Sequence, residues 1–110
     1  MEVQAITKNV RMSAQKMREM VRQIQGLPAL QAQAILAVVP RKSARVVAKT
    51  LKSAIANAEN NNGARAETLR IKLAVAGTAP TLKRFTPKAR GSAGPILKRS
   101  CHVKIVLSDE

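Results

Sequence analysis

A twenty-residue stretch near the carboxyl end, from Pro80 to Arg99, limits most strongly what this chain can fold into. It contains six cationic residues and no acidic residue. Three prolines and two glycines would interrupt any helix there: Pro80, Pro87, Pro95, Gly91 and Gly94. An unstructured loop of this length is uncommon inside a compact domain unless the loop has a function or is disordered.

The segments on both sides of this stretch alternate between apolar and other residues. This alternation predicts strands over residues 69–78 and 96–108 whose apolar sides face one core. The apolar positions are Leu69, Ile71, Leu73 and Val75 before the stretch, and Val103, Ile105 and Leu107 after it. We therefore predict that residues 80–99 form a two-stranded arm reaching roughly 30 Å from the body, at ~3.3 Å per residue. The alternative is a disordered basic loop, which the prolines and the resumed alternation disfavour.

A two-stranded arm cannot bury its own backbone or offset the entropy cost of its ordering, so the prediction requires a partner. The chain carries a formal net charge of +14 over 110 residues and has an estimated pI of 11.5. This charge points first to a nucleic acid and second to an anionic membrane. The single Phe and the absence of Trp and Tyr indicate a thin core, and therefore marginal stability until the partner binds.

Length and patterning predict one α+β domain over residues 1–110, with residues 80–99 as its protruding basic arm. We expect a small antiparallel sheet of about three strands packed against three helices, with a long extended β-hairpin near the C-terminus. The remaining predicted elements are a strand over Val3–Thr7 and helices over Ala14–Gln25, Ala29–Val38 and Arg41–Asn61.

Helical spacing and capping residues support these three helices. In the first, Met17, Val21 and Ile24 fall on one side, and Ser13 is placed to cap its start. In the second, we expect these apolar residues to form the face: Leu30, Ala34, Ala37 and Val38. In the third, the apolar positions recur at three- and four-residue spacing: Ala44, Val47, Ala48, Leu51, Ala54, Ile55 and Ala58. Gly26 and Gly63 stand where left-handed helix caps are expected.

Nothing in the sequence has the spacing of a catalytic or metal site, so we expect no catalytic residue, no metal and no cofactor. Cys101 and His102 are the only Cys and His, and adjacent strand residues point to opposite faces, which rules out a thiol–imidazole dyad. Cys101 is interpreted as a small packed residue rather than a reactive thiol. Without a long apolar run or a signal leader, the chain is expected to be intracellular and soluble, with no membrane partner.

The cationic residues form three groups, and they are the candidate binding residues. The first group surrounds the start of the first helix and consists of Arg11, Lys16 and Arg18. The second is a stripe on the third helix, formed by Arg45, Lys49 and Lys52. The third lies in the arm and contains Lys83, Arg84, Lys88, Arg90, Lys98 and Arg99. The stripe on the third helix is either a solvated face or an RNA-facing surface. If six cations each neutralise a phosphate, log affinity should fall with log salt at a slope of about −4 to −5.

One aromatic residue, Phe85, cannot form a multi-ring platform for stacking bases, and no motif for reading a DNA groove is present. We therefore predict that the basic surfaces follow the shape of a folded RNA. A free DNA-compacting protein and an anionic-membrane binder remain the alternatives. The first would need a dimer surface, which nothing suggests, so no homo-oligomer is expected. The second would need bulky apolar anchors beside the cations.

Three motifs in the right order resemble one known family, the large-subunit ribosomal proteins numbered twenty-two. They are Arg11-Met-Ser13-Ala-Gln-Lys16-Met-Arg18, Ser53-Ala-Ile-Ala-Asn57-Ala-Glu59-Asn60-Asn61, and Lys83 to Gly91 followed by His102 to Leu107. The match covers nearly the whole chain. The resemblance implies a structural, non-catalytic protein that binds large-subunit ribosomal RNA, in a cytoplasmic ribosome or an organellar one.

The resemblance also implies roles for the arm and for the cations. The body would sit near the opening of the nascent-peptide exit tunnel, beside other ribosomal proteins, and the arm would reach inward to line it. The cations of all three groups would contact RNA. A tip would line the tunnel and could meet nascent peptides and macrolide antibiotics: Phe85, Pro87, Lys88, Ala89, Arg90 and Gly91.

Overall fold

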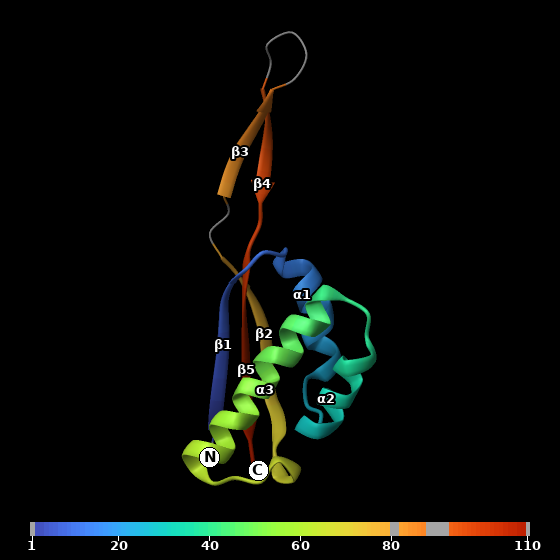
Figure 1. Ribbon diagram of the computed structural model, residues 1–110, viewed down its shortest axis with the longest axis vertical. Helices are drawn as coiled ribbons and strands as arrows, with labels where there is room; N and C mark the ends of the chain where they lie inside the picture. The colour runs from blue at the N-terminus through green and yellow to red at the C-terminus, as the bar shows by residue number, and fades with distance from the viewer. Residues whose placement is uncertain (1, 80–81, 88–92, 110) are drawn as a thin grey trace.

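The computed structural model describes residues 2–79, 82–87 and 93–109, with residues 82–87 and 93–98 described through their backbone. Its elements follow in this order along the chain: β1 (Glu2–Val10), α1 (Ala14–Ile24), α2 (Ala29–Val38), α3 (Lys42–Asn62), the 3-10 helix η1 (Ala66–Thr68), β2 (Arg70–Thr78), β3 (Leu82–Pro87), β4 (Ala93–Lys98) and β5 (Cys101–Ser108). Figure 1 shows the three α-helices beside one sheet, with a second, smaller sheet extending beyond the body.

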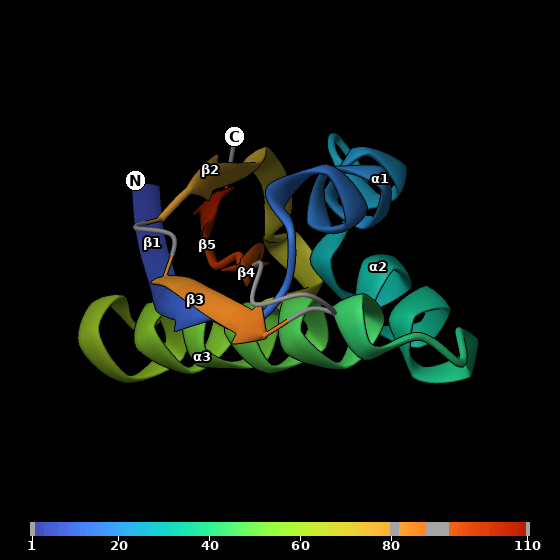
Figure 2. The same cartoon turned by 90° about the horizontal axis from the view of Figure 1, so that it is seen from above.

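The predicted fold class is confirmed. β1, β5 and β2 form an antiparallel sheet in the order β1-β5-β2, so the last strand lies in the centre. The helices lie on one face of this sheet, with α1 against β2 and α3 against β1 and β5 (Figure 2). α2 packs on α3 rather than on a strand of the sheet. β3 and β4 pair only with each other, also antiparallel, in a separate two-stranded sheet.

The strand register gives the body two distinct ends. At one end Glu2 and Arg70 both lie opposite Ser108, next to the two chain termini, and we call this the termini end. At the other end Val10 and Thr78 both lie opposite Cys101, where the chain leaves for β3 and returns from β4. We call this the arm end. α1 begins four residues after Val10, so its N-terminus also lies at the arm end (Figure 1).

The core fills the space between the sheet and α1 and α3, as the spacing of their apolar residues predicts. Met17 and Ile24 of α1 and Leu51 of α3 are completely buried against Ile105 and Leu107 of β5. Along α3 the predicted apolar positions are buried except Ala48, which is half-buried. Two of the largest completely buried side chains are methionines, whose flexible thioethers fill a core without large aromatic rings.

The predicted caps are confirmed as well. The Ser13 hydroxyl accepts a hydrogen bond from the Lys16 amide at 3.4 Å and caps α1. Gly63 ends α3 in the left-handed conformation at φ +63°, where its amide donates to the Glu59 carbonyl at 3.2 Å. Helix α1 ends one residue earlier than predicted, with Gln25 as its cap and Gly26 beyond it at φ +83°.

The predicted apolar face of α2 is wrong. The helix buries Ala29, Ala32 and Leu36, whereas Leu30 is 43% exposed and Val38 is 79% exposed. Apolar residues surround this helix on all sides, so its sequence contains no single stripe that could select a face. The small Ala29 and Ala32 side chains face inward because they let α2 pack closely against α3. This tertiary contact, and not the helix sequence alone, determines which face of α2 is buried.

The strand predictions around the arm also need correction. Leu73 and Val75 were expected in the core, but Leu73 is half-buried and Val75 is 40% exposed. A register shift between Ile71 and Leu73 moves the later residues of β2 by one position, so Ala74 and Ala76 point into the core instead. The predicted return strand over residues 96–108 is in fact two strands, because β4 pairs with β3 whereas β5 pairs with β1 and β2.

The first strand is longer than the predicted Val3–Thr7 because an irregularity lets it continue. The register shifts between Thr7 and Val10, and Asn9 adopts a left-handed conformation at φ +58°. The Asn9 amide donates to Nδ1 of His102 at 3.0 Å, so a side chain of β5 satisfies a backbone donor that the shifted ladder leaves unpaired.

The two leucines of α2 give a matched test of its buried face. We expect Leu36→Ala to lower the free energy of unfolding by about 2–5 kcal/mol, because the side chain is buried and a cavity remains. Leu30→Ala should cost less than about 1 kcal/mol, since the side chain is already partly in water. Urea unfolding of both variants measures this. Equal losses, or a larger loss at Leu30, would contradict the observed orientation of the helix.

Candidate nucleic-acid interface

The cations predicted around the start of α1 lie together at the arm end of the body. Arg11 is exposed in the connection between β1 and α1, and Lys16 and Arg18 are exposed on α1. The sequence prediction missed Lys42, at the start of α3, whose Nζ donates to the Arg11 carbonyl at 3.2 Å. This contact is between residues 31 positions apart and has no signal in the sequence.

The Arg18 side chain is held in place rather than free in solvent. Its Nε donates to the Ala76 carbonyl of β2 at 3.0 Å, which fixes the guanidinium group against the edge of the sheet. The remaining nitrogens of the group stay available, because guanidinium has five N–H donors in a fixed planar arrangement. A tethered guanidinium loses less entropy when it binds an anion than a free side chain does.

The predicted stripe on α3 is exposed along its length. Arg45, Lys49 and Lys52 follow one another at four- and three-residue spacing on the side away from the core. Arg41, which caps the helix start, extends the same spacing by four residues and was missed. An Arg41 Nη nitrogen lies 3.7 Å from a carboxylate oxygen of Glu19 on α1, in a solvent-exposed ion pair. Such pairs contribute little to stability.

The arm residues fall into three groups by how the structure describes them. Lys83, Arg84, Phe85 and Pro87 lie on β3 and Lys98 on β4, placed by their backbone. Arg99 is exposed in the break between β4 and β5. The predicted residues Lys88, Ala89, Arg90 and Gly91 lie outside the described residues.

Acidic residues collect at the opposite end of the body. Glu2 begins β1, Asp109 follows β5, and Glu59 and Glu67 lie in the last turns of α3 and in η1. Among the described acidic residues only Glu19 lies elsewhere, on α1. The charged residues of the body are therefore unevenly distributed along its long axis, and the described cations at the arm end have fewer acidic neighbours than those at the termini end.

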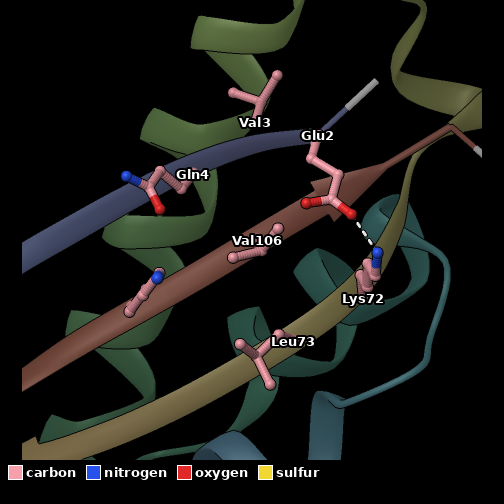
Figure 3. Close-up of a pocket in the computed structure, with 7 residues that line it drawn as sticks. Glu2, Val3, Gln4, Lys72, Leu73 and Val106 are labelled. Atoms are coloured by element: carbon pink, nitrogen blue, oxygen red, sulfur yellow. Dashed lines mark hydrogen bonds and ion pairs between the residues drawn. The ribbon is translucent and has the colours of Figure 1, made fainter.

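A hollow on the outer face of the sheet lies at the termini end. It has a volume of about 400 Å³ and is bordered by Glu2, Lys72, Leu73 and Val106 (Figure 3). Glu2 and Lys72 reach toward each other and form an ion pair that joins the two outer strands. The hydrogen bond from Lys72 and its positive charge lower the pKa of the Glu2 carboxyl. Lys104 lines the hollow as well, so the lining holds two cations and one carboxylate.

Within the described part of the chain, no three His, Cys, Asp or Glu residues are grouped so that they could hold a metal ion. Cys101 is completely buried and His102 is half-buried next to it, where its ring accepts the Asn9 amide. The interpretation of Cys101 as a packed core residue is confirmed. No helix in residues 2–79 or 93–109 has the length and apolar character needed to cross a membrane.

A model of the family described as ribosomal protein L22p/L17e matches residues 5–108, from β1 to the end of β5. The chain belongs to this family. It is 57% identical to the large ribosomal subunit protein uL22 of Opitutus terrae, over 99% of this chain and 96% of that protein. It is 47% identical to the protein of the same name from Akkermansia muciniphila, over 100% of this chain and 98% of that protein.

Membership of the L22p/L17e family confirms the resemblance predicted from the three motifs. The chain is accordingly a structural constituent of the large ribosomal subunit, not an enzyme. Its location is the ribosome, which is cytoplasmic in bacteria. The cations at the arm end and on α3 are thus the candidate interface of a ribonucleoprotein component.

The buried thiol provides a test of the core beneath this interface. Burial raises the pKa of Cys101, so we expect Ellman's reagent to react with it slowly in the native chain at pH 8 and fast in 8 M urea. Because the unfolded thiol ionises at lower pH than the folded one, stability should also fall as pH rises above the ordinary thiol pKa. Rapid native labelling would show that β5 is open at this residue.

Proposed function

We propose that this L22p/L17e protein binds large-subunit ribosomal RNA with its arm and with the basic arm end of its body. It would thereby support assembly of the subunit. The proposal treats residues 1–110 as one domain and residues 80–99 as a basic arm that lines the nascent-peptide exit tunnel. The observation that carries it is the separate β3–β4 sheet, which extends from the most basic end of the body (Figure 1).

The dimensions of the chain support a partner for the arm. The Cα radius of gyration is 17.1 Å, and the principal extents are 63, 26 and 17 Å. A compact domain of this length would have a radius of gyration of about 13 Å. The excess length comes from a two-stranded sheet, which is marginally stable by itself in water. Binding to phosphates would offset both the ordering cost and the repulsion among its cations.

The proposed RNA contacts of the body are those whose positions the structure gives. Arg11, Lys16, Arg18 and Lys42 lie at the arm end, and the α3 stripe formed by Arg41, Arg45, Lys49 and Lys52 continues from there. An RNA that folds around the arm could meet both surfaces at once. Such binding follows the backbone and shape of the RNA rather than its base sequence.

The proposed role of the arm tip comes from the family resemblance. Phe85, Pro87, Lys88, Ala89, Arg90 and Gly91 would line the tunnel, with Lys83, Arg84, Lys98 and Arg99 holding the strands against RNA. Neighbouring ribosomal proteins would complete the wall. Nascent peptides, and macrolide antibiotics where these bind, would meet the tip. No membrane and no second copy of the chain is part of this proposal.

Charge reversal in the arm tests the RNA-binding role. We expect Arg84→Glu with Arg90→Glu to weaken binding to structured large-subunit rRNA more than tenfold at physiological salt, and to flatten the slope of log affinity against log salt by about 1.5. The melting temperature should stay nearly unchanged, because the proposal places both residues in the arm. Filter binding over a range of salt concentrations and differential scanning calorimetry measure the two effects.

Arg65→Glu with Arg70→Glu is the matched control. It reverses the same number of charges on exposed residues at the termini end, away from the proposed surface. We expect the control to retain affinity apart from the general effect of charge. If the arm and control variants bind rRNA equally, or if duplex DNA competes as well as rRNA does, the proposed role of the arm is wrong.

Hydrogen exchange tests whether the arm needs RNA. In the free chain we expect fast amide exchange across Leu82–Pro87 and Ala93–Lys98, because two strands alone hold their hydrogen bonds weakly. On assembled large subunits the same amides should become protected. The amides of β5, paired on both sides, serve as the reference for slow exchange in both states. Strong protection of β3 and β4 in the free chain would contradict the proposal.

A further inference from the structure

A polar hollow of about 470 Å³ lies at the arm end, between the first turn of α1 and the root of the arm. One wall comes from Ser13, Gln15 and Arg18 of the body. The other comes from the ends of the two chain segments that leave for the arm, including Arg99 and Ser100. No acidic residue lines the hollow, whereas two arginines do.

The first turn of α1 presents free backbone donors to this hollow. The Ser13 hydroxyl accepts the Lys16 amide and the Ser13 carbonyl accepts the Met17 amide. The amides of Ala14 and Gln15 reach no acceptor within the part of the chain that the structure describes. Free amides at the start of a helix attract anions through their N–H groups and through the helix dipole.

An independent observation at the opposite wall also points to a ligand. Ser100 is only 9% exposed, and its side chain makes no hydrogen bond to any residue that the structure describes. Its carbonyl accepts the Ala79 amide at 3.1 Å, which fixes the residue at the arm root. No fully buried side-chain oxygen or nitrogen lacks a partner in the described residues, so the Ser100 hydroxyl keeps some accessible surface, and Ser100 lines the hollow. A nearly buried donor without a protein partner is suited to a ligand oxygen.

The two arginines add charge from both walls. Arg18 is positioned by its hydrogen bond to the Ala76 carbonyl, which leaves its outer nitrogens free. Arg99 is exposed in the break between β4 and β5. The hollow is thus lined by hydrogen-bond donors: two backbone amides, one hydroxyl and two guanidinium groups. No carboxylate is among the lining residues. This combination matches the oxygens of a phosphate group.

The geometry points to this hollow as the binding site for one phosphodiester group of an RNA strand, held between α1 and the root of the arm. The inference rests on the proposed RNA-binding function and specifies one contact within it. The amides of Ala14 and Gln15 and the Arg18 guanidinium bind from the body, and Arg99 and the Ser100 hydroxyl bind from the arm root. A phosphate in this position joins the two parts and fixes the direction in which the arm leaves the body.

RNA binding by single variants of the full chain tests the site. The probe is in vitro transcribed large-subunit rRNA of Opitutus terrae, whose uL22 protein is 57% identical to this chain. We expect Arg99→Gln to weaken binding roughly tenfold and to flatten the salt slope by about 0.7–0.9, the contribution of one phosphate contact. Ser100→Ala should weaken binding several-fold with no change in slope, since it removes no charge.

Arg65→Gln is the control, because it removes the same charge from an exposed residue at the termini end. Equal effects of Arg99→Gln and Arg65→Gln on affinity and slope would overturn the inference while leaving RNA binding intact. Loss of rRNA binding by the unmodified chain would instead overturn the proposed function. Melting temperatures show whether each variant is folded. If Arg99→Gln is unfolded, Arg99→Lys is measured in its place, and we expect it to retain part of the affinity for rRNA.

Amide shifts give a second measurement that does not depend on affinity. In the ¹⁵N-labelled full chain, titration with inorganic phosphate should shift the amides of Ala14 and Gln15 more than those of Lys42 and Ser43 at the start of α3, and Arg99→Gln should reduce the difference. When fragments of the Opitutus terrae large-subunit rRNA are titrated one by one, the fragment that binds the chain most tightly should shift the same amides. Equal shifts at both helix starts, or shifts with free phosphate and none with RNA, would overturn the inference.

Discussion

The structure depends on the pairing of β5 with strands from both ends of the sequence. β5 lies between β1 and β2, and its buried residues Val103, Ile105 and Leu107 meet the apolar faces of α1 and α3. Its contacts with β1 join residues about a hundred positions apart, so the chain must close a long loop before the core can form. Because β5 follows the arm directly, the same strand that completes the core also fixes one side of the arm root.

Electrostatic repulsion acts against this compact body, and the uneven placement of charge concentrates the repulsion at the arm end. The described acidic residues lie mainly at the termini end, where the Glu2–Lys72 ion pair joins the outer strands. The cations at the arm end have few acidic neighbours, apart from the Glu19–Arg41 pair. A surface of this kind is destabilising in isolation and favourable beside phosphates, so stability and function are coupled through the partner.

The sequence predicted those parts of the fold that depend on local patterns. The three- and four-residue spacing in α3, the Ser13 cap and the left-handed Gly63 are local, and the structure has them as predicted. The orientation of α2 was wrong because its apolar residues surround the helix and only the contact with α3 selects Leu36 over Leu30. The face of Val75 was wrong because the register shift after Ile71 depends on pairing with β5, which the sequence of β2 does not specify.

The same division applies to the candidate site. Charge density alone made Arg18 and Arg99 candidate binding residues, because a run of basic residues without acidic ones can be seen in the sequence itself. Ser100 and the amides of Ala14 and Gln15 carry no such signal, because the roles proposed for them depend on the start of α1 meeting the arm root. The tether from Arg18 to the Ala76 carbonyl joins residues 58 positions apart and was likewise invisible.

The change of strand partners at Arg99 and Ser100 has a consequence for how members of such a family can vary. β3 and β4 share no ladder with the sheet of the body, so their register is set independently of β1, β5 and β2. Insertions or deletions of one residue in each of β3 and β4 would change the reach of the arm and leave every side chain of the body on its present face. Arm length is therefore a separately adjustable trait, open to divergence between species while the globular scaffold stays constant.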